Sequence, residues 1–299
     1  MSESRPAGAA HCNNCWSNAQ NELYAAGVAQ KHRIVQCAEC GLMYAHPLSS
    51  DNVLQYLAPF DKSRLLTDGS PEVMRGRAKL PDYVPIEPIL AKLLPDRGLL
   101  VEIGAYAGQL LEQFRRAGWS VLGVEPDGRA VQYAREQLKV DVREGTLESL
   151  QLQTETVDVV LLIHVIEHMD DPDTAVRTIS EILRPGGIFV VETPTYDSFT
   201  YRIFGRRERN LSCDGHIYFY TEKTLGALLE KRGFELVRIE RVGRTMTFSQ
   251  LLKNVGVMSK SARVKRMLTR FSDFVGLENR HIHLNILDII RIYAKKRIF

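Results

Sequence analysis

From residue 99 onward, short apolar runs of strand length alternate with amphipathic stretches of helical length. This alternation predicts a parallel sheet with helices on both faces, because each helix that crosses between two strands must pack onto the sheet. We expect strands at residues 99–103, 121–124, 140–143, 157–163, 188–191, 234–242 and 284–293. We expect helices at residues 85–94, 109–117, 129–138, 173–183 and 221–232.

The last two predicted strands, 234–242 and 284–293, follow one another without the helix of a parallel crossover. A dehydrogenase sheet continues with alternating strands and helices, so this ending distinguishes the pattern from a dehydrogenase. The sequence therefore predicts an α/β fold with a Rossmann-like, doubly wound sheet.

The composition is that of a globular protein with a buried core. With 299 residues, 44% of them hydrophobic and 25% charged, the chain has room for one sizeable α/β domain and a smaller unit. No run approaches the ~20 consecutive apolar residues of a membrane span, and residues 1–10 lack the apolar core of a signal peptide. We therefore expect a cytoplasmic protein. A formal net charge of +3 is too small to indicate nucleic-acid binding.

Four of the five cysteines form two pairs with CxxC spacing, Cys12 with Cys15 and Cys37 with Cys40. In a reducing compartment this spacing indicates a metal site rather than disulfides. Two such pairs complete the tetrahedral, all-thiolate shell of a structural zinc ion, which leaves no open position for catalysis. The alternating run 33–36 leads into the second pair like a strand of a zinc ribbon. Cys213 lies far from both pairs and has no predicted role.

These features divide the chain into three predicted parts. Residues 1–46 form a small zinc-binding module, and residues 47–98 form a connector that prolines break into short pieces with short helices. Residues 99–299 form the domain that contains the sheet, with insertions at about 194–220 and 243–282.

A turn that contains two glycines, Glu102 to Gly108, follows the first predicted strand. Its glycines let the backbone approach a ligand closely, and the helix behind them offers N–H groups. Glu125 ends the next strand, where an acid can accept hydrogen bonds from both hydroxyls of an adenosine ribose. Residues 104–109 lack the GxGxxG spacing of a nicotinamide site, which argues against a nicotinamide cofactor.

Together, four segments resemble the class I S-adenosylmethionine-dependent methyltransferases: Glu102–Gly108, Glu125, Val157–His168 and Leu183–Gly187. The strings HVIEHMDDP and HIYFYTEKTLGALLEKRGFE resemble a broad bacterial group related to ubiquinone-biosynthesis and sugar methyltransferases. The resemblance implies S-adenosylmethionine as cofactor, with Gly104 and Gly108 at its methionine end and Glu125 on its ribose. Thr146 and Leu147 would lie beside the adenine. The predicted cofactor contacts also include Glu102, Tyr106 and His164.

Tyr106 departs from the family pattern, which usually has a glycine at this position. Its side chain must therefore point away from the cofactor or cover it as a lid.

The acceptor of a methyl group must be aligned with the methyl and must lose a proton. In an open α/β sheet the acceptor pocket lies beyond the C-terminal ends of the strands, and the strand 157–163 delivers His164, Glu167 and His168 to that edge. If the chain turns helical after this strand, the three side chains share one helical face. His216 is the fourth candidate for the chemistry.

Three roles stay open for these residues. Glu167 and His168 can be structural, or His168 or His216 can be a general base, since histidine titrates near neutral pH. The segment also resembles the E-x-x-E-H motif of metal-dependent ubiquinone-pathway and small-RNA ribose O-methyltransferases, with His164 in place of the first Glu. That resemblance implies a catalytic divalent metal with His216 as a further ligand, and an imidazole ligand favours a softer transition metal over Mg²⁺.

Two basic segments are candidates for contact with an acceptor, a membrane or a second subunit. The insertion 194–220 carries arginines that either meet an anionic acceptor or remain solvated: Arg202, Arg206, Arg207 and Arg209. Residues 251–271 mix basic and apolar side chains like an amphipathic helix. Such a helix fits a plain surface position, a cover for the substrate cleft, a peripheral contact with an anionic membrane, or a homodimer contact.

The combined prediction is an S-adenosylmethionine-dependent methyltransferase that O-methylates a small hydroxylated metabolite, such as a sugar or a secondary-metabolite intermediate. N- or C-methylation of a related small molecule stays open, because the cofactor fold does not choose the acceptor atom. An RNA methyltransferase is a further alternative, but the low net charge and the lack of aromatic–basic alternation in residues 1–46 argue against nucleic acid. Tyr106 also keeps open a catalytically inactive, cofactor-binding partner subunit.

Overall fold

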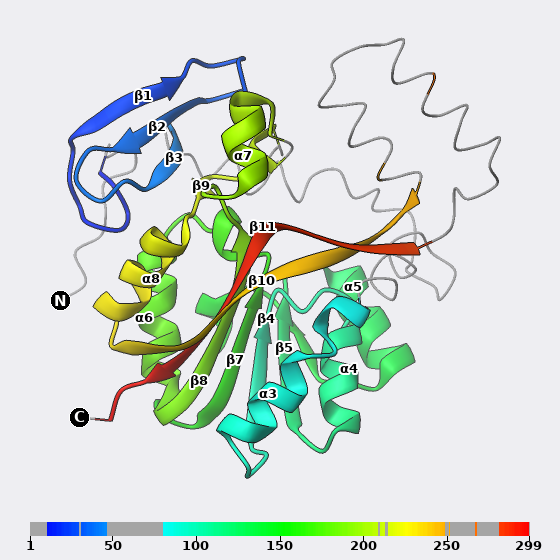
Figure 1. The fold of residues 1–299 in the computed structure, drawn as a ribbon. Coiled ribbons are helices and arrows are strands. Elements are labelled where there is room, and N and C mark those ends of the chain that lie inside the picture. Colours follow the sequence, from blue (N-terminus) through cyan, green and yellow to red (C-terminus); the bar gives the residue numbers. More distant parts are fainter. Residues whose placement is uncertain are drawn as a thin grey trace.

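The computed structural model describes residues 11–29, 31–46, 80–208, 210–212, 215–248, 251, 267 and 281–298. Within these residues a seven-stranded sheet with flanking helices forms the larger part of the protein, and a four-stranded sheet lies beside it (Figure 1). The predicted α/β, Rossmann-like doubly wound fold is confirmed.

The larger sheet has the strand order β10-β11-β8-β7-β4-β5-β6. Its parallel strands are β4 (Leu99–Ile103), β5 (Ser120–Glu125), β6 (Val142–Glu144), β7 (Val157–Ile163) and β8 (Leu183–Pro194). Strand β11 (His281–Lys296) lies antiparallel between β8 and β10 (Phe234–Thr247). The reversed last strand confirms the expected difference from a dehydrogenase sheet.

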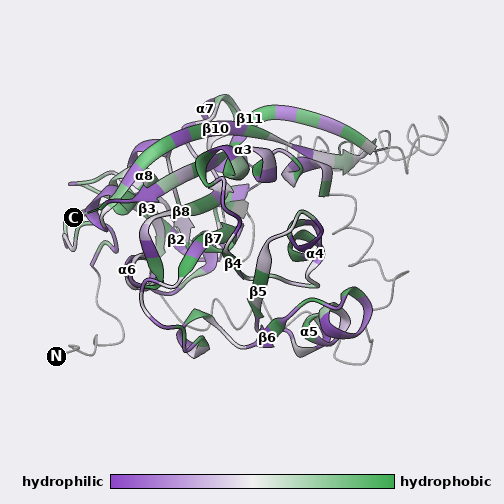
Figure 2. Ribbon diagram, turned by 90° about the horizontal axis from the view of Figure 1, so that it is seen from below, coloured by the Kyte–Doolittle hydropathy of each residue, from purple (hydrophilic) through white to green (hydrophobic). Residues whose placement is uncertain are grey.

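Helices cover both faces of this sheet (Figure 2). One face is covered by α3 (Ile86–Leu93), α4 (Gln109–Arg116) and α5 (Gly128–Tyr133). The other face is covered by α6 (Pro172–Ile182) and α8 (Glu222–Lys231). Successive strand residues serve opposite faces, so Leu100 packs with the first group and Val101 with the second. This double coverage explains why the strands are apolar along their whole length.

The predicted strand 140–143 was wrong at both ends, because the observed β6 spans Val142–Glu144. The preceding helical turn η1 (Ala134–Leu138) ends at Lys139, whose φ of 56° is left-handed. The N–H of Val140 still donates to the carbonyl of Ala134. Residues 139–140 therefore complete the helix end, and pairing with β5 begins only afterwards.

The last three strands extend beyond their predicted bounds of 188–191, 234–242 and 284–293. Strand β8 pairs with β11 as far as Pro194, whereas β10 and β11 pair with each other through Thr247 and His281. The outer part of these two strands is thus a two-stranded ribbon beyond the sheet. A ribbon has no layer packed on both of its faces, so its sequence lacks the continuous apolar run that signals a buried strand.

The smaller sheet has the order β1-β2-β3-β9. Its strands are β1 (Gln20–Tyr24), β2 (Arg33–Cys37), β3 (Met43–His46) and β9 (Tyr218–Phe219). The predicted strand before the second cysteine pair is confirmed as β2. Strand β9 belongs to the segment 194–220 of the larger domain, so the N-terminal module and that domain share a sheet. Among the described residues no helix is both long and apolar enough to cross a membrane.

Candidate functional site

The turn after β4 has a backbone open to a ligand. Gly104 and Gly108 have φ values of 74° and 76°, in the left-handed region that favours glycine. A Cβ on Gly104 would lie 2.5 Å from Val165 Cγ2, and a Cβ on Gly108 would lie 2.8 Å from Val140 Cγ2. Both positions therefore require glycine, and Gly104 lies directly against the segment that follows β7.

Two buried carboxylates support this turn. Glu125 accepts the N–H of Tyr106 at 2.9 Å and that of Asp127 at 3.0 Å. Burial raises the pKa of Glu125, although these two hydrogen bonds oppose the shift. Burial, with the nearby charge of Glu125, raises the pKa of Glu102 well above its usual value, and Glu102 Oε2 finds no hydrogen-bond partner among the described residues. A buried oxygen without a partner is costly, so a donor group of a bound cofactor fits this position.

Tyr106 takes a glycine-like conformation in the turn, with a φ of 48°. A non-glycine residue held there costs on the order of 1 kcal/mol, and the surrounding contacts must compensate. The ring packs against Ala107 and Tyr133. This packing directs the Tyr106 ring towards α5.

Thr146 and Leu147 lie at the same sheet edge as Glu125. Strand β6 pairs with β5, and the N–H of Gly145 donates to the carbonyl of Glu125 at 3.0 Å. Thr146 follows and precedes the short helix η2 (Leu147–Ser149), whose Leu147 is buried. The structure therefore brings these predicted adenine neighbours next to the predicted ribose ligand.

Three of the four predicted transfer residues gather beyond the end of β7. Glu167 and His168 lie on the short 3₁₀ helix η3 (Ile166–His168), and His216 lies just before β9. One ligand atom from each lies within 4.8 Å of the others, and all three residues are buried. The expected helical face directly after β7 was wrong, because His164 has a φ of 56° and precedes the helix.

His164 lies between two carboxylates. Its Nδ1 is 3.5 Å from Glu167 Oε1, and its Nε2 is 3.1 Å from Glu192 Oε1. Burial alone would lower the pKa of His164, but the close contacts with these two carboxylates outweigh burial and raise the pKa to about 9. His164 is therefore an imidazolium at neutral pH, and it lies between Glu167 and Glu192.

Glu192 connects this network to Arg291, which the sequence analysis did not single out. Arg291 Nε donates to Glu192 Oε2 at 2.7 Å, and Arg291 Nη2 donates to the carbonyl of Asp82 at 2.9 Å. Arg291 is 1% exposed. The available signal was a charge beside a short apolar run: Glu192 follows residues 188–191 in β8, and Arg291 interrupts the run 289–293 in the middle of β11.

The gathered residues differ in charge. Burial would raise the pKa of Glu167, but the contact with His164 and the charges of the nearby histidines lower it to about 2, so Glu167 is anionic. Burial lowers the pKa of His216 to about 4, so its ring is neutral at pH 7. His168 Nδ1 lies 2.8 Å from the carbonyl oxygen of Gly215, which can only accept. In its neutral form the His168 ring therefore carries its proton on Nδ1, and Nε2 is its basic nitrogen.

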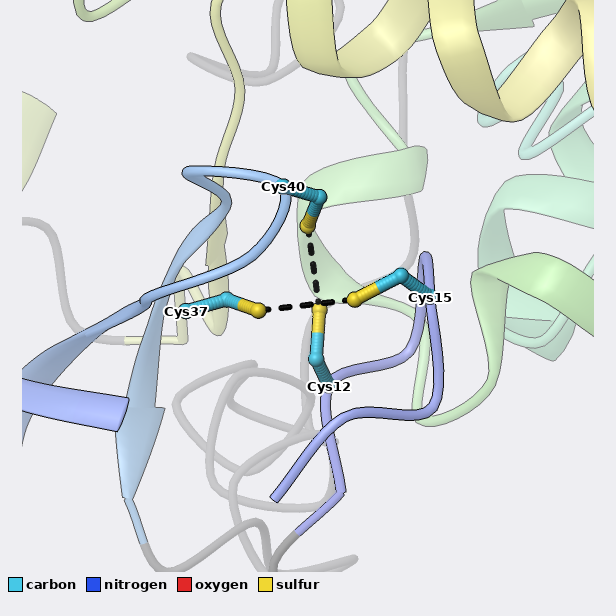
Figure 3. A group of neighbouring side chains, drawn as sticks. All are labelled: Cys12, Cys15, Cys37 and Cys40. Atoms are coloured by element: carbon cyan, nitrogen blue, oxygen red, sulfur yellow. Dashed lines mark hydrogen bonds between the residues drawn. The ribbon is translucent and has the colours of Figure 1, made fainter. Parts of the chain in front are cut away.

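The four cysteines of the two CxxC pairs converge on one point (Figure 3). The Sγ atoms of Cys12 and Cys40 are 3.4 Å apart, as are those of Cys15 and Cys37, and all four lie within 4.8 Å of one another. A disulfide needs about 2.05 Å between its sulfurs. Four thiolates around zinc at about 2.3 Å from each sulfur give separations close to those observed, so the donor set fits a closed structural zinc site.

Of the arginines expected either to meet an anionic acceptor or to remain solvated, Arg202 lies on α7 (Phe199–Phe204), and Arg206 and Arg207 lie in the turn after it. Arg202, Arg206 and Arg207 are exposed. Arg209 and Cys213 lie outside the described residues, as does nearly all of the basic segment 251–271.

Comparisons with known proteins agree with this arrangement. Residues 77–239, more than half of the chain, match the family described as "Methyltransferase domain". The ubiquinone biosynthesis O-methyltransferase of Azorhizobium caulinodans is 34% identical over 156 residues, which are 48% of this chain and 62% of that protein. The enzyme of the same name from Cereibacter sphaeroides is 35% identical over 160 residues, 50% of this chain and 65% of that protein. The chain thus spans somewhat less than two thirds of the length of these relatives.

Among solved structures, the PH0226 protein of Pyrococcus horikoshii OT3 is similar with a TM-score of 0.50 at 16% identity. The likeness covers 81% of this chain and 99% of that one, and it concerns the fold alone. The chain belongs to the methyltransferase-domain family, and its α/β domain is a class I S-adenosylmethionine-dependent methyltransferase domain.

Proposed function

We propose that this protein transfers the methyl group of S-adenosylmethionine to an oxygen of a small hydroxylated acceptor. The observation that carries the proposal is the contact between the cofactor turn and the transfer residues. Gly104 lies against Val165, and the next residues along the chain form the helix η3 with Glu167 and His168. The cofactor supplies a methyl group activated on a sulfonium, and an acceptor aligned with it needs a group that takes its proton. The relatives named ubiquinone biosynthesis O-methyltransferase support oxygen as the acceptor atom.

His168 is the residue that we assign to the proton. Its Nδ1–H donates to the Gly215 carbonyl, which fixes the ring orientation and leaves the basic character on Nε2. His216 packs against it with the ring centroids 4.7 Å apart and remains neutral, so the two rings do not repel each other as cations. The anionic Glu167 lies close enough to stabilise a positive charge that forms on His168 during proton uptake.

In a second candidate mechanism, a bound divalent metal takes the place of the histidine base. Glu167, His168 and His216 supply one carboxylate and two imidazoles within 4.8 Å of one another, a donor set that suits transition metals. The ion would gather the acceptor oxygen and lower its pKa. Chelation separates the two modes: activity that survives removal of all metal except the cysteine-bound ion supports the base, and activity that returns only with added divalent ion supports the metal.

The proposed function is tested by an acceptor screen with S-adenosylmethionine labelled on its methyl group. The panel contains phenols, catechols and sugar nucleotides, with amines and RNA as comparisons. Label transferred to a hydroxyl supports the proposal. Label only on nitrogen, carbon or RNA, or no binding of the cofactor in calorimetry, would contradict it.

Glu125→Ala is expected to raise the Kd for S-adenosylmethionine by about 10- to 100-fold, because charge-assisted hydrogen bonds contribute roughly 1.5–3 kcal/mol. The change removes the carboxylate assigned to the ribose and also the acceptor of the Tyr106 and Asp127 N–H groups. Calorimetry measures the affinity. Asp141→Ala, an exposed acid near the neighbouring strand, is the matched control and is expected to bind the cofactor normally. Equal affinities for the two variants would reject the ribose assignment.

We also propose that the four cysteines hold a structural zinc ion. Freshly purified protein is expected to contain one zinc per chain by elemental analysis, and Cys37→Ser is expected to lose it, because a four-thiolate shell needs every ligand. Glu39→Ala, between the cysteines of the second pair, should keep its zinc. A wild-type zinc content well below one per chain would refute a filled site.

A further inference from the structure

The first cysteine knuckle (residues 12–15) is hydrogen-bonded to the start of α6. Between its cysteines, Asn13 Nδ2 donates to Asp171 Oδ1 at 3.0 Å, and Asn13 Oδ1 accepts the N–H of Asp173 at 2.7 Å. Asp171 is the N-cap residue of α6. Because η3 ends just before this cap, Asn13 fixes one end of the segment that bears the transfer residues Glu167 and His168.

The next residue of the knuckle binds α8. Asn14 Nδ2 donates to the carbonyl of Thr224 at 2.7 Å, and Lys231 Nζ donates to the carbonyl of Asn14 at 2.8 Å. Asn13 and Asn14 are both buried. The first knuckle is therefore hydrogen-bonded to both α6 and α8.

The second knuckle (residues 37–40) leads directly into β3, which reaches the transfer site by another route. The N–H of Ala45 donates to the carbonyl of Ile217 at 2.8 Å, and the N–H of Ile217 donates to the carbonyl of Glu167 at 2.8 Å. The Ile217 peptide groups are thus bonded to the module on one side and to η3 on the other. His216 is the residue immediately before Ile217, so β3 limits how far His216 can move from Glu167.

A row of aromatic side chains runs in parallel with this backbone connection. The hydroxyl of Tyr24 in β1 lies 3.2 Å from that of Tyr201 in α7. The ring of Tyr201 packs edge-on against Tyr196, and the Tyr196 hydroxyl lies 3.5 Å from His216 Nδ1. The module therefore also supports the His216 ring.

We propose that the N-terminal module is a positioning element of the transfer site, with Asn13 and β3 as the two contacts that hold His216 against Glu167 and His168. Each contact starts from a different knuckle, and the four cysteines bring the two knuckles together. An ion bound there fixes the two contacts relative to each other and thereby the width of the transfer site. The expected effect on turnover rests on the proposed function, whereas the positioning of His216 by the module does not.

The test compares four variants of the full chain. Cys15→Ala removes one ligand, and Cys15→His supplies a nitrogen that completes a three-cysteine, one-histidine zinc site. Asn13→Ala keeps all four cysteines and removes one of the two contacts. Glu22→Ala, in an exposed ion pair on the edge strand β1, is the matched control.

Hydrogen–deuterium exchange of the peptide 216–220 is the direct measurement and needs no acceptor. Faster exchange is expected in Cys15→Ala and Asn13→Ala, and wild-type exchange in Cys15→His and Glu22→Ala. The Kd for S-adenosylmethionine should stay unchanged in all four, because the cofactor turn follows β4 and Glu125 ends β5, away from the residues that Asn13 and β3 contact. Turnover of the panel compound that the wild type methylates fastest should fall about 10- to 100-fold in Cys15→Ala and Asn13→Ala, the usual cost of a misplacement near 1 Å.

Exchange of 216–220 at the wild-type rate in zinc-free Cys15→Ala and in Asn13→Ala would overturn the positioning proposal. So would a parallel loss of cofactor affinity and turnover, which indicates general unfolding instead. If the wild type binds no cofactor and methylates nothing, the proposed function fails, and the exchange data still decide whether the module positions His216.

Discussion

Glu167→Gln is expected to lower turnover by about 10²- to 10⁴-fold without changing the Kd for S-adenosylmethionine, the range that general acid–base groups contribute. The variant keeps the shape and can still accept the Thr193 hydroxyl, whose hydrogen bond to Glu167 is 2.9 Å long. It removes the negative charge that faces His168 and His216, so a cation on His168 loses its stabilisation. In the metal mode the variant loses the one carboxylate ligand, so both modes predict the same direction.

Labelled-methyl transfer measures the turnover, and calorimetry measures the cofactor affinity. Glu181→Gln, an exposed glutamate on α6 paired with Arg177, is the control and should have wild-type activity. Unchanged turnover in Glu167→Gln would place the chemistry at other residues and would contradict the site assignment.

Arg291→Met is expected to lower the free energy of unfolding by about 3–5 kcal/mol, the usual cost of breaking one side of a buried ion pair. The change leaves the buried Glu192 carboxylate without its nearest cation, which lies 2.7 Å away in the wild type. It also removes the hydrogen bond from Arg291 to the carbonyl of Asp82, which joins the chain before α3 to β11.

Urea unfolding provides the measurement. Arg177→Met, in an exposed pair with Glu181, is the control and is expected to be nearly neutral. A double variant, Glu192→Gln with Arg291→Met, should recover part of the lost stability because it removes the excess buried negative charge that the single variant leaves beside His164. If Arg291→Met is as stable as the control, the Arg291–Glu192 pair does not contribute the expected stability.

The glycine turn and the acid that we assign to the cofactor could be located largely from the sequence. Gly104, Gly108 and Glu125 were identifiable because a tight turn and an acid at a strand end depend on local sequence and on the order of the strands. The orientation of Tyr106 could not be predicted, since it depends on contact with Tyr133 in α5. The role of Glu102 depends on the same kind of information: only the fold shows that its Oε2 is buried without a partner among the described residues.

The limit of prediction from the sequence is clearer for the residues that we assign to methyl transfer. His164, Glu167 and His168 were identified by their place after a strand, but the sequence could not tell which of them meet. The structure brings Glu167 and His168 to His216, whereas it directs His164 towards Glu192. His164 therefore binds two acids as a cation, although its sequence position resembles that of a metal ligand.

By itself the sequence determined the α/β class, the glycine turn and the two cysteine pairs, because each is encoded by a short period or spacing within one segment. Only the tertiary structure decided that Arg291 neutralises Glu192, from which it is separated by 99 positions, and that Asn13 binds the cap of α6. Hydropathy patterns state which side chains are buried, but not which buried polar groups become partners. That choice follows from the packing of distant segments, which forces every buried charge and amide to find the partner that the fold places beside it.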